Sequence, residues 1–129
     1  MRKVILTKNA PAPLNNLYSQ AIIVQGGSLL FTAGQVGIDP RTGKLVEGGL
    51  QAQTRQALEN IKAIVQQAGS SMSKVVKVTV LLDNIDDFAA MNEIYKTYFP
   101  DSPPARTAFE AARLPIGALV EIEAVAQLD

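Results

Sequence analysis

The chain has 129 residues, a length that suits one domain. Apolar residues make up 47% and charged residues 19%, which is typical of a globular protein and excludes a disordered composition. Twelve basic and twelve acidic residues cancel without any basic run, so the charge pattern of a nucleic-acid-binding protein is missing. The absence of cysteine and histidine excludes disulfides, thiol nucleophiles and the usual proton shuttles.

The N-terminus gives no clear targeting signal. The apolar stretch after Arg2 and Lys3 is too short for a secretory signal, and no segment approaches the length that spans a membrane. We therefore expect a cytoplasmic protein with no membrane partner. The two basic residues leave a mitochondrial location open.

The first half of the chain is predicted to hold extended segments and one long helix. Residues 4–7 form a short strand and residues 9–16 a loop. Residues 21–24 and 29–32 flank Gly26-Gly27, which predicts a two-residue hairpin. A turn over 39–43 separates two more extended stretches. From residue 50 to 68 apolar positions recur at helical spacing, and Gly69 is predicted to end the helix.

The second half alternates strands and a helix. Residues 75–82 form a strand, and Asp86 is the predicted N-cap of a helix that runs to about residue 99. Strands follow over 106–112 and 118–127, joined by a turn. The order β-β-β-α-β-α-β-β predicts a single α+β domain over residues 1–129, with two helices on one face of a sheet.

The other face of this sheet is predicted to be half apolar. The residues expected on it are Val75, Lys77, Thr79 and Leu81, with Leu30 and Thr32 one strand away. Such a surface is more readily buried against another subunit than left in water. The alternative is a solvated face, as many antiparallel sheets have.

The main candidate site combines Arg106, at the start of a predicted strand, with Glu121 on the next strand. An arginine can bind a carboxylate or phosphate through two parallel hydrogen bonds. A glutamate near it could orient or deprotonate a water. Glu123 shares a strand face with Glu121. The alternatives are a surface ion pair for the arginine and an ordinary half-solvated strand for the glutamates.

Asn92 lies beside the apolar stripe of the second predicted helix, where a buried amide needs hydrogen-bond partners. Holding a neighbouring loop is one explanation. Other patterns are incomplete: residues 34–37 lack the third glycine of a dinucleotide fingerprint, and Ser70-Ser71 has no histidine to activate it. No metal site is predicted.

Short motifs along the whole chain, in a specific order and spacing, resemble one family. They include Tyr18-Ser19-Gln20-Ala21, Ala33-Gly34-Gln35, Met91-Asn92, Pro104-Ala105-Arg106 and Glu121-Ile122-Glu123-Ala124. In these residues the chain resembles the RidA (YjgF-type) reactive-intermediate, or 2-imino-acid, deaminases. The resemblance implies a chorismate-mutase-like fold and a homotrimer whose sheets form a central barrel, with sites in the clefts between neighbours.

The resemblance also implies an activity: hydrolysis of 2-iminobutanoate and 2-iminopropanoate to 2-oxo acids and ammonia, without a cofactor. By position, Arg106 would hold the substrate carboxylate and Glu121 would position or activate water. Tyr18 and Asn92 would line or brace the pocket. Backbone groups at Ala33, Gly34 and Ala108 would contact the substrate.

Three positions depart from the family pattern. Asn16-Leu17 precedes the tyrosine where Gly-Pro is common, Ala33 replaces a common serine, and Ala108 replaces a common cysteine. Two other functions stay open on the sequence. A 2-oxo acid binding or sensing protein would need Arg106 without Glu121. RNA cleavage, linked to members of this family, is disfavoured by zero net charge and the lack of histidine.

Overall fold

The computed structural model describes residues 2–128, and its centre is a five-stranded mixed sheet. The strand order is β3-β9-β7-β8, and β4 also pairs with β9. These strands are β3 (Ser28–Phe31), β4 (Gln35–Val36), β7 (Val75–Leu82), β8 (Ala105–Glu110) and β9 (Val120–Leu128). Strand β8 runs parallel to β7, and the other pairs are antiparallel.

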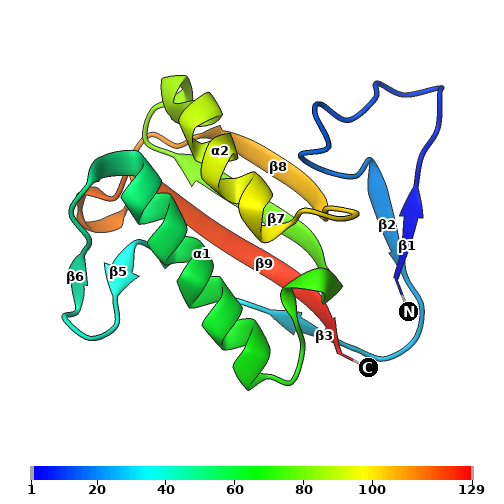
Figure 1. The fold of residues 1–129 in the computed structure, drawn as a ribbon, viewed down its shortest axis with the longest axis horizontal. Helices are drawn as coiled ribbons and strands as arrows, with labels where there is room; N and C mark the ends of the chain where they lie inside the picture. The colour runs from blue at the N-terminus through cyan, green and yellow to red at the C-terminus, as the bar shows by residue number, and fades with distance from the viewer. Residues whose placement is uncertain (1, 129) are drawn as a thin grey trace.

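Two helices, α1 (Gly49–Gln67) and α2 (Phe88–Tyr98), lie next to each other over one face of this sheet (Figure 1). The remaining short elements are β1 (Arg2–Ile5), β2 (Ala21–Val24), β5 (Ile38–Asp39), β6 (Lys44–Leu45) and the 3₁₀ turns η1 (Met72–Lys74), η2 (Ile85–Asp87) and η3 (Pro115–Gly117). The predicted α+β fold with two helices on one sheet face is confirmed. In Figure 1 the β1–β2 hairpin stands apart from the main sheet.

The core lies between the helices and the inner face of the sheet. On that face Val78, Val80 and Leu82 of β7 lie opposite Ala124, Ile122 and Val120 of β9. All six side chains are buried. They pack against the apolar stripe of α1, which includes Leu58, Ile61 and Val65. Helix α1 ends as predicted: Gly69 has a φ of 88°, and the N–H of Ser70 donates to the carbonyl of Val65 at 3.0 Å.

The predicted start of α2 is wrong. Asp86 does not cap the helix, because it lies within the turn η2 that precedes it. Its backbone N–H donates to Oδ1 of Asn84 at 2.9 Å, so Asn84 caps the turn. The apolar stripe of α2 is confirmed, with Met91, Tyr95 and the following Phe99 buried against the sheet.

The predicted hairpin between residues 21–24 and 29–32 is wrong. Strands β2 and β3 flank Gly26-Gly27, but β2 pairs with β1 while β3 pairs with β9. Both glycines adopt positive φ angles, 68° and 73°, so the chain does turn there. The turn passes the chain from one sheet to another instead of closing a hairpin. Strands β8 and β9 follow each other along the chain but are separated in the sheet, because β7 lies between them.

The open face of the sheet is half apolar, as predicted, but some of its residues differ. Leu30 pairs with the buried Ala126 and packs on the core, so its neighbours Leu29 and Phe31 point outwards, 44% and 69% exposed. A register shift between Val75 and Lys77 buries Val75 completely. Thr32 lies beyond the end of β3, where it bonds to the backbone of Ala124.

Gly37 marks a close approach between the chain after β4 and helix α1. A Cβ built on Gly37 would lie 2.7 Å from Cα of Gln53 and 2.8 Å from its carbonyl oxygen. We expect Gly37→Ala to lower the free energy of unfolding by about 1–3 kcal/mol, because backbone atoms must move to make room. Urea titration measures this change.

Gly34→Ala is the matched control. The three atoms nearest to its added methyl all belong to the movable side chain of Glu121, so the loss of stability should be smaller. Equal stability of Gly37→Ala and wild type would show that the contact with α1 is not tight.

Candidate functional site

Arg106 lies near the start of β8 and faces the helices. Its partner in the sheet is Val78, whose side chain belongs to the core. Nη1 of Arg106 donates a hydrogen bond to Oδ1 of Asn92, on α2, at 2.7 Å. Asn92 is buried, so this bond satisfies the amide oxygen that the sequence places beside an apolar stripe.

Aromatic rings surround the guanidinium of Arg106. Its Cζ lies 4.8 Å from the ring centroid of Tyr95, 5.4 Å from that of Phe88 and 5.9 Å from that of Tyr18. Burial lowers the pKa of Arg106, although an arginine keeps its charge near neutral pH. Within residues 2–128 no carboxylate forms an ion pair with this guanidinium. A half-buried cation of this kind is suited to bind an anionic group.

Tyr18 reaches Arg106 despite the unusual residues before it. Asn15 and Asn16 take left-handed φ angles of 47° and 57°, which asparagine tolerates well. Ser19, directly after Tyr18, holds this segment in place. Its N–H donates to the carbonyl of Pro104 at 3.1 Å, and its hydroxyl donates to the carbonyl of Pro103. These bonds tie the loop to the segment that leads into β8.

Ala108 completes this part of the site. It lies two residues beyond Arg106 on the same face of β8 and packs against the core. The structure therefore brings together four of the predicted residues, here named the arginine cluster: Tyr18, Asn92, Arg106 and Ala108.

Glu121 lies on the opposite face of the sheet. It pairs with Leu81 of β7 and Val36 of β4, and its neighbours Val120 and Ile122 point into the core. A Cβ on Gly34 would overlap Oε2 of Glu121, so only glycine lets the carboxylate rest against this backbone. Ala33, Gly34 and Glu121 form a second group, here named the glutamate cluster.

One chain does not bring Arg106 and Glu121 together. Arg106 lies beside Val78, and Val78 lies beside Ala124, three residues from Glu121 along β9. Two strand spacings and three residues separate the backbones by roughly 10 Å in each direction. Because the side chains also point to opposite faces, a site that uses both would need two chains.

The comparisons with known proteins agree with this fold. A family model described as Endoribonuclease L-PSP matches residues 7–128. The chain belongs to the YjgF/RidA family.

Among its relatives, a RutC family protein of Pyrococcus horikoshii is 56% identical over 98% of both chains. A 2-iminobutanoate/2-iminopropanoate deaminase of Mus musculus is 51% identical over 98% of this chain and 91% of that protein. The crystal structure of RidA from an Antarctic Psychrobacter matches with a TM-score of 0.76 and 43% identity, covering 98% of this chain and 99% of the other. Escherichia coli TdcF with bound serine matches with a TM-score of 0.76 and 40% identity over the same shares.

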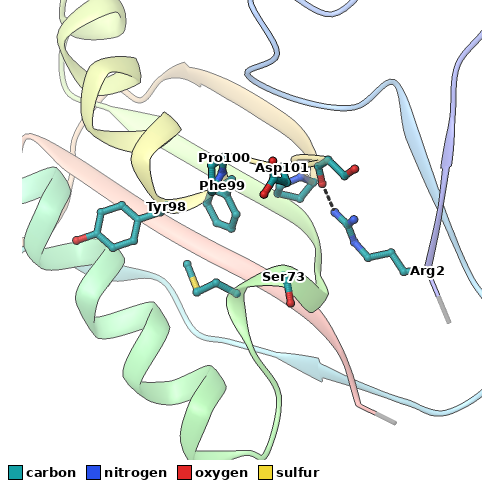
Figure 2. A pocket seen from close by; sticks show the side chains of 9 residues that line it. Arg2, Ser73, Tyr98, Phe99, Pro100 and Asp101 are labelled. Carbon is teal, nitrogen blue, oxygen red and sulfur yellow. Dashed lines mark hydrogen bonds between the residues drawn. The ribbon is translucent and has the colours of Figure 1, made fainter.

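A separate cavity of about 100 Å³ lies between the end of α2, η1 and the segment before β8 in this YjgF/RidA chain (Figure 2). Figure 2 shows Arg2 reaching towards that segment, where its Nη2 donates to the carbonyl of Ser102 at 2.8 Å. Its Nε donates to the carbonyl of Val75 at 3.2 Å. Both donors bind backbone oxygens, so the side chain of Arg2 anchors β1 to the segments that begin β7 and precede β8.

The sequence alone did not identify Phe88 and Tyr95 as neighbours of Arg106, because both belong to the apolar stripe predicted for the second helix. Their spacing could have indicated it: Phe88 lies four residues before Asn92 and Tyr95 three residues after it, so all three lie on one helix face. Within residues 2–128 no cluster of acidic side chains could hold a metal ion, and no helix is long and apolar enough to cross a membrane.

Proposed function

We propose that this protein hydrolyses 2-iminobutanoate and 2-iminopropanoate to the corresponding 2-oxo acids and ammonia. The observation that carries the proposal is the half-buried guanidinium of Arg106, which has an amide and three rings around it but no carboxylate partner within residues 2–128. A substrate carboxylate would supply that partner. The naming of mouse and rat relatives, 51% and 48% identical, as deaminases for these two imines supports the reaction class.

The chemistry needs one anion-binding group and one base. The N–H groups of Arg106 that do not bind Asn92 would hold the substrate carboxylate. Glu121 would orient a water and accept its proton as the water oxygen bonds to the imine carbon. Glu121 would return this proton to the imine nitrogen, which gives the neutral carbinolamine. The hydroxyl proton then moves to the nitrogen, again through Glu121, as the C=O bond forms and the C–N bond breaks, and the nitrogen leaves as ammonia. Imines hydrolyse unaided, so orientation and one base supply a sufficient reduction of the barrier. No cofactor enters this scheme.

We further propose that the working form is a homotrimer in which the arginine cluster of one subunit faces the glutamate cluster of the next. Two features support assembly through the sheet. The open face exposes Leu29, Phe31 and Phe109, and a patch of this kind favours burial against another subunit. Strand β8 is an edge strand whose outer backbone groups have no partner strand within residues 2–128. Light scattering is expected to give the trimer mass.

A coupled assay tests the activity. A threonine dehydratase generates the imine, and the purified protein should accelerate imine loss and the appearance of 2-oxobutanoate in proportion to its concentration. The dehydratase alone and the dehydratase with Arg106→Ala protein are the controls. An unchanged rate at all protein concentrations would contradict the deaminase proposal.

A second candidate is a protein that binds 2-oxo acids without catalysis. It is favoured by one observation: the arginine cluster is complete within one chain, whereas Glu121 lies on the other face. Binding of 2-oxobutanoate together with an unchanged imine rate would support this candidate.

Mixing two inactive variants tests the shared site. Arg106→Ala and Glu121→Gln each disable every site of their own trimer. When equal amounts of the two chains assemble at random, about a quarter of all sites receive an intact Arg106 from one chain and an intact Glu121 from its neighbour. Co-expression in equal amounts should therefore restore about a quarter of wild-type turnover. No recovery in verified mixed trimers would place both residues of each site on one chain.

A further inference from the structure

The hydrogen bond to Asn92 alone does not define how Arg106 presents its donors. Arginine has a long side chain with several rotatable bonds, and a single contact through Nη1 leaves the guanidinium free to turn about that bond. Two-point binding of a carboxylate requires a defined edge of the guanidinium to face the ligand. A second restraint on the guanidinium is therefore needed.

Tyr95 is placed to supply that restraint. Its ring centroid is the nearest of the three to Cζ of Arg106, at 4.8 Å, well inside the range of a cation–π contact. The side chain is completely buried and packs against Phe99, with ring centroids 4.9 Å apart. The ring is thus a rigid surface beside the guanidinium, and it is shielded from any ligand.

We propose that Tyr95 is a positioning residue for Arg106, whose ring holds the guanidinium so that the donors not bound to Asn92 face the substrate carboxylate. The proposal rests on the carboxylate-binding role given to Arg106 above. Tyr95 acts through Arg106 alone. Asn92 restrains one donor and the ring restrains the guanidinium beside it, so together they prepare the side chain before a ligand arrives.

The ring, and not the hydroxyl, carries this role. Oη of Tyr95 is buried and has no hydrogen-bond partner within residues 2–128. Burial raises the pKa of Tyr95 far above its usual value, while the nearby charge of Arg106 acts in the opposite direction, so the hydroxyl is neutral at physiological pH. Removing the hydroxyl leaves the ring face unchanged.

Binding measurements separate positioning from packing. Calorimetry gives Kd for 2-oxobutanoate and for its uncharged amide, 2-oxobutanamide, with wild type, Tyr95→Phe, Tyr95→Leu and Ile94→Ala. We expect Tyr95→Phe to bind the acid within about twofold of wild type, since the ring remains. Tyr95→Leu should bind the acid about two- to tenfold more weakly, the usual penalty for ordering one long side chain on binding. Its affinity for the amide should not change.

Ile94→Ala is the matched control, because it removes buried apolar side-chain atoms from the same helix. Ile94 is not one of the three residues whose rings surround Arg106. It should keep the wild-type preference for the acid. Thermal unfolding checks that each variant is folded. If Tyr95→Leu does not fold, Tyr95→Met takes its place with the same expected result, because a flexible unbranched side chain fills irregular core space.

Unchanged acid affinity in Tyr95→Leu or Tyr95→Met, or an equal loss for acid and amide, would overturn the proposal. A wild type that shows no preference for the acid would overturn it together with the role of Arg106. Wild-type protein could be inactive in the imine assay while the Tyr95 variants still show the expected loss of acid affinity. That result would contradict the deaminase proposal and leave the role of Tyr95 unaffected.

Discussion

Glu121→Gln should lower the turnover of imine hydrolysis by roughly 10²–10⁴-fold, the usual contribution of a general base. Glutamine keeps the shape and most of the hydrogen-bonding capacity of the side chain but cannot accept the proton of the attacking water. Binding of 2-oxobutanoate should stay within a few-fold of wild type, because Arg106 and its hydrogen bond to Asn92 are unchanged. Steady-state kinetics and calorimetry measure the two effects.

Glu123→Gln is the matched control for this change. Glu123 lies on the same face of β9, two residues along, opposite Thr79, and is exposed. The strand rise separates the two glutamates by about 6–7 Å, so only one of them can hold a given water. Glu123→Gln should therefore keep near wild-type turnover. Wild-type turnover in Glu121→Gln would instead make Glu121 structural and favour the 2-oxo acid binding function.

Arg106→Lys should be nearly as damaging as Arg106→Ala. A lysine ammonium keeps the charge, but it cannot bind Asn92 and a carboxylate with the planar set of donors that arginine has. The loss of transition-state stabilisation should be on the order of 2–5 kcal/mol for a desolvated charge pair. The ratio of kcat/KM between wild type and variant measures it.

Arg113→Lys controls for the substitution itself, because Arg113 is exposed and lies beyond the end of β8, whereas Arg106 lies near the start of that strand. It should leave kcat/KM unchanged. Full activity in Arg106→Lys would show that positive charge is sufficient and that two-point binding is wrong.

Local features of the fold could be predicted from the sequence because local patterns determine them. The alternation of residues 75–82 predicted β7 with its correct bounds. Helical spacing followed by Gly69 predicted α1 to within one residue at each end. Asn92 could be identified as unusual because one polar side chain interrupts an apolar stripe.

Strand pairing, and the sheet face on which each side chain lies, were harder to predict from the sequence because they depend on residues far apart along the chain. Gly26-Gly27 predicted a hairpin, but the apolar side chain of Leu30 finds its place opposite Ala126, almost a hundred residues away. The face of Arg106 could not be deduced from the sequence of β8, because the adjacent apolar residues Ala108 and Phe109 lie on opposite faces and leave neither face clearly apolar. Only the register with Val78 places Arg106 on the helix side and separates it from Glu121.

Because Arg106 and Glu121 lie on opposite faces of the sheet, the proposed activity per chain would depend on the total concentration of the protein. Dilution below the dissociation constant of the trimer would separate the two clusters even where each chain stays folded, and excess substrate would not restore the missing half. Specific activity would then fall as total concentration falls. In a cell, a modest decrease in expression would remove a larger share of the imine-clearing capacity than of the protein itself.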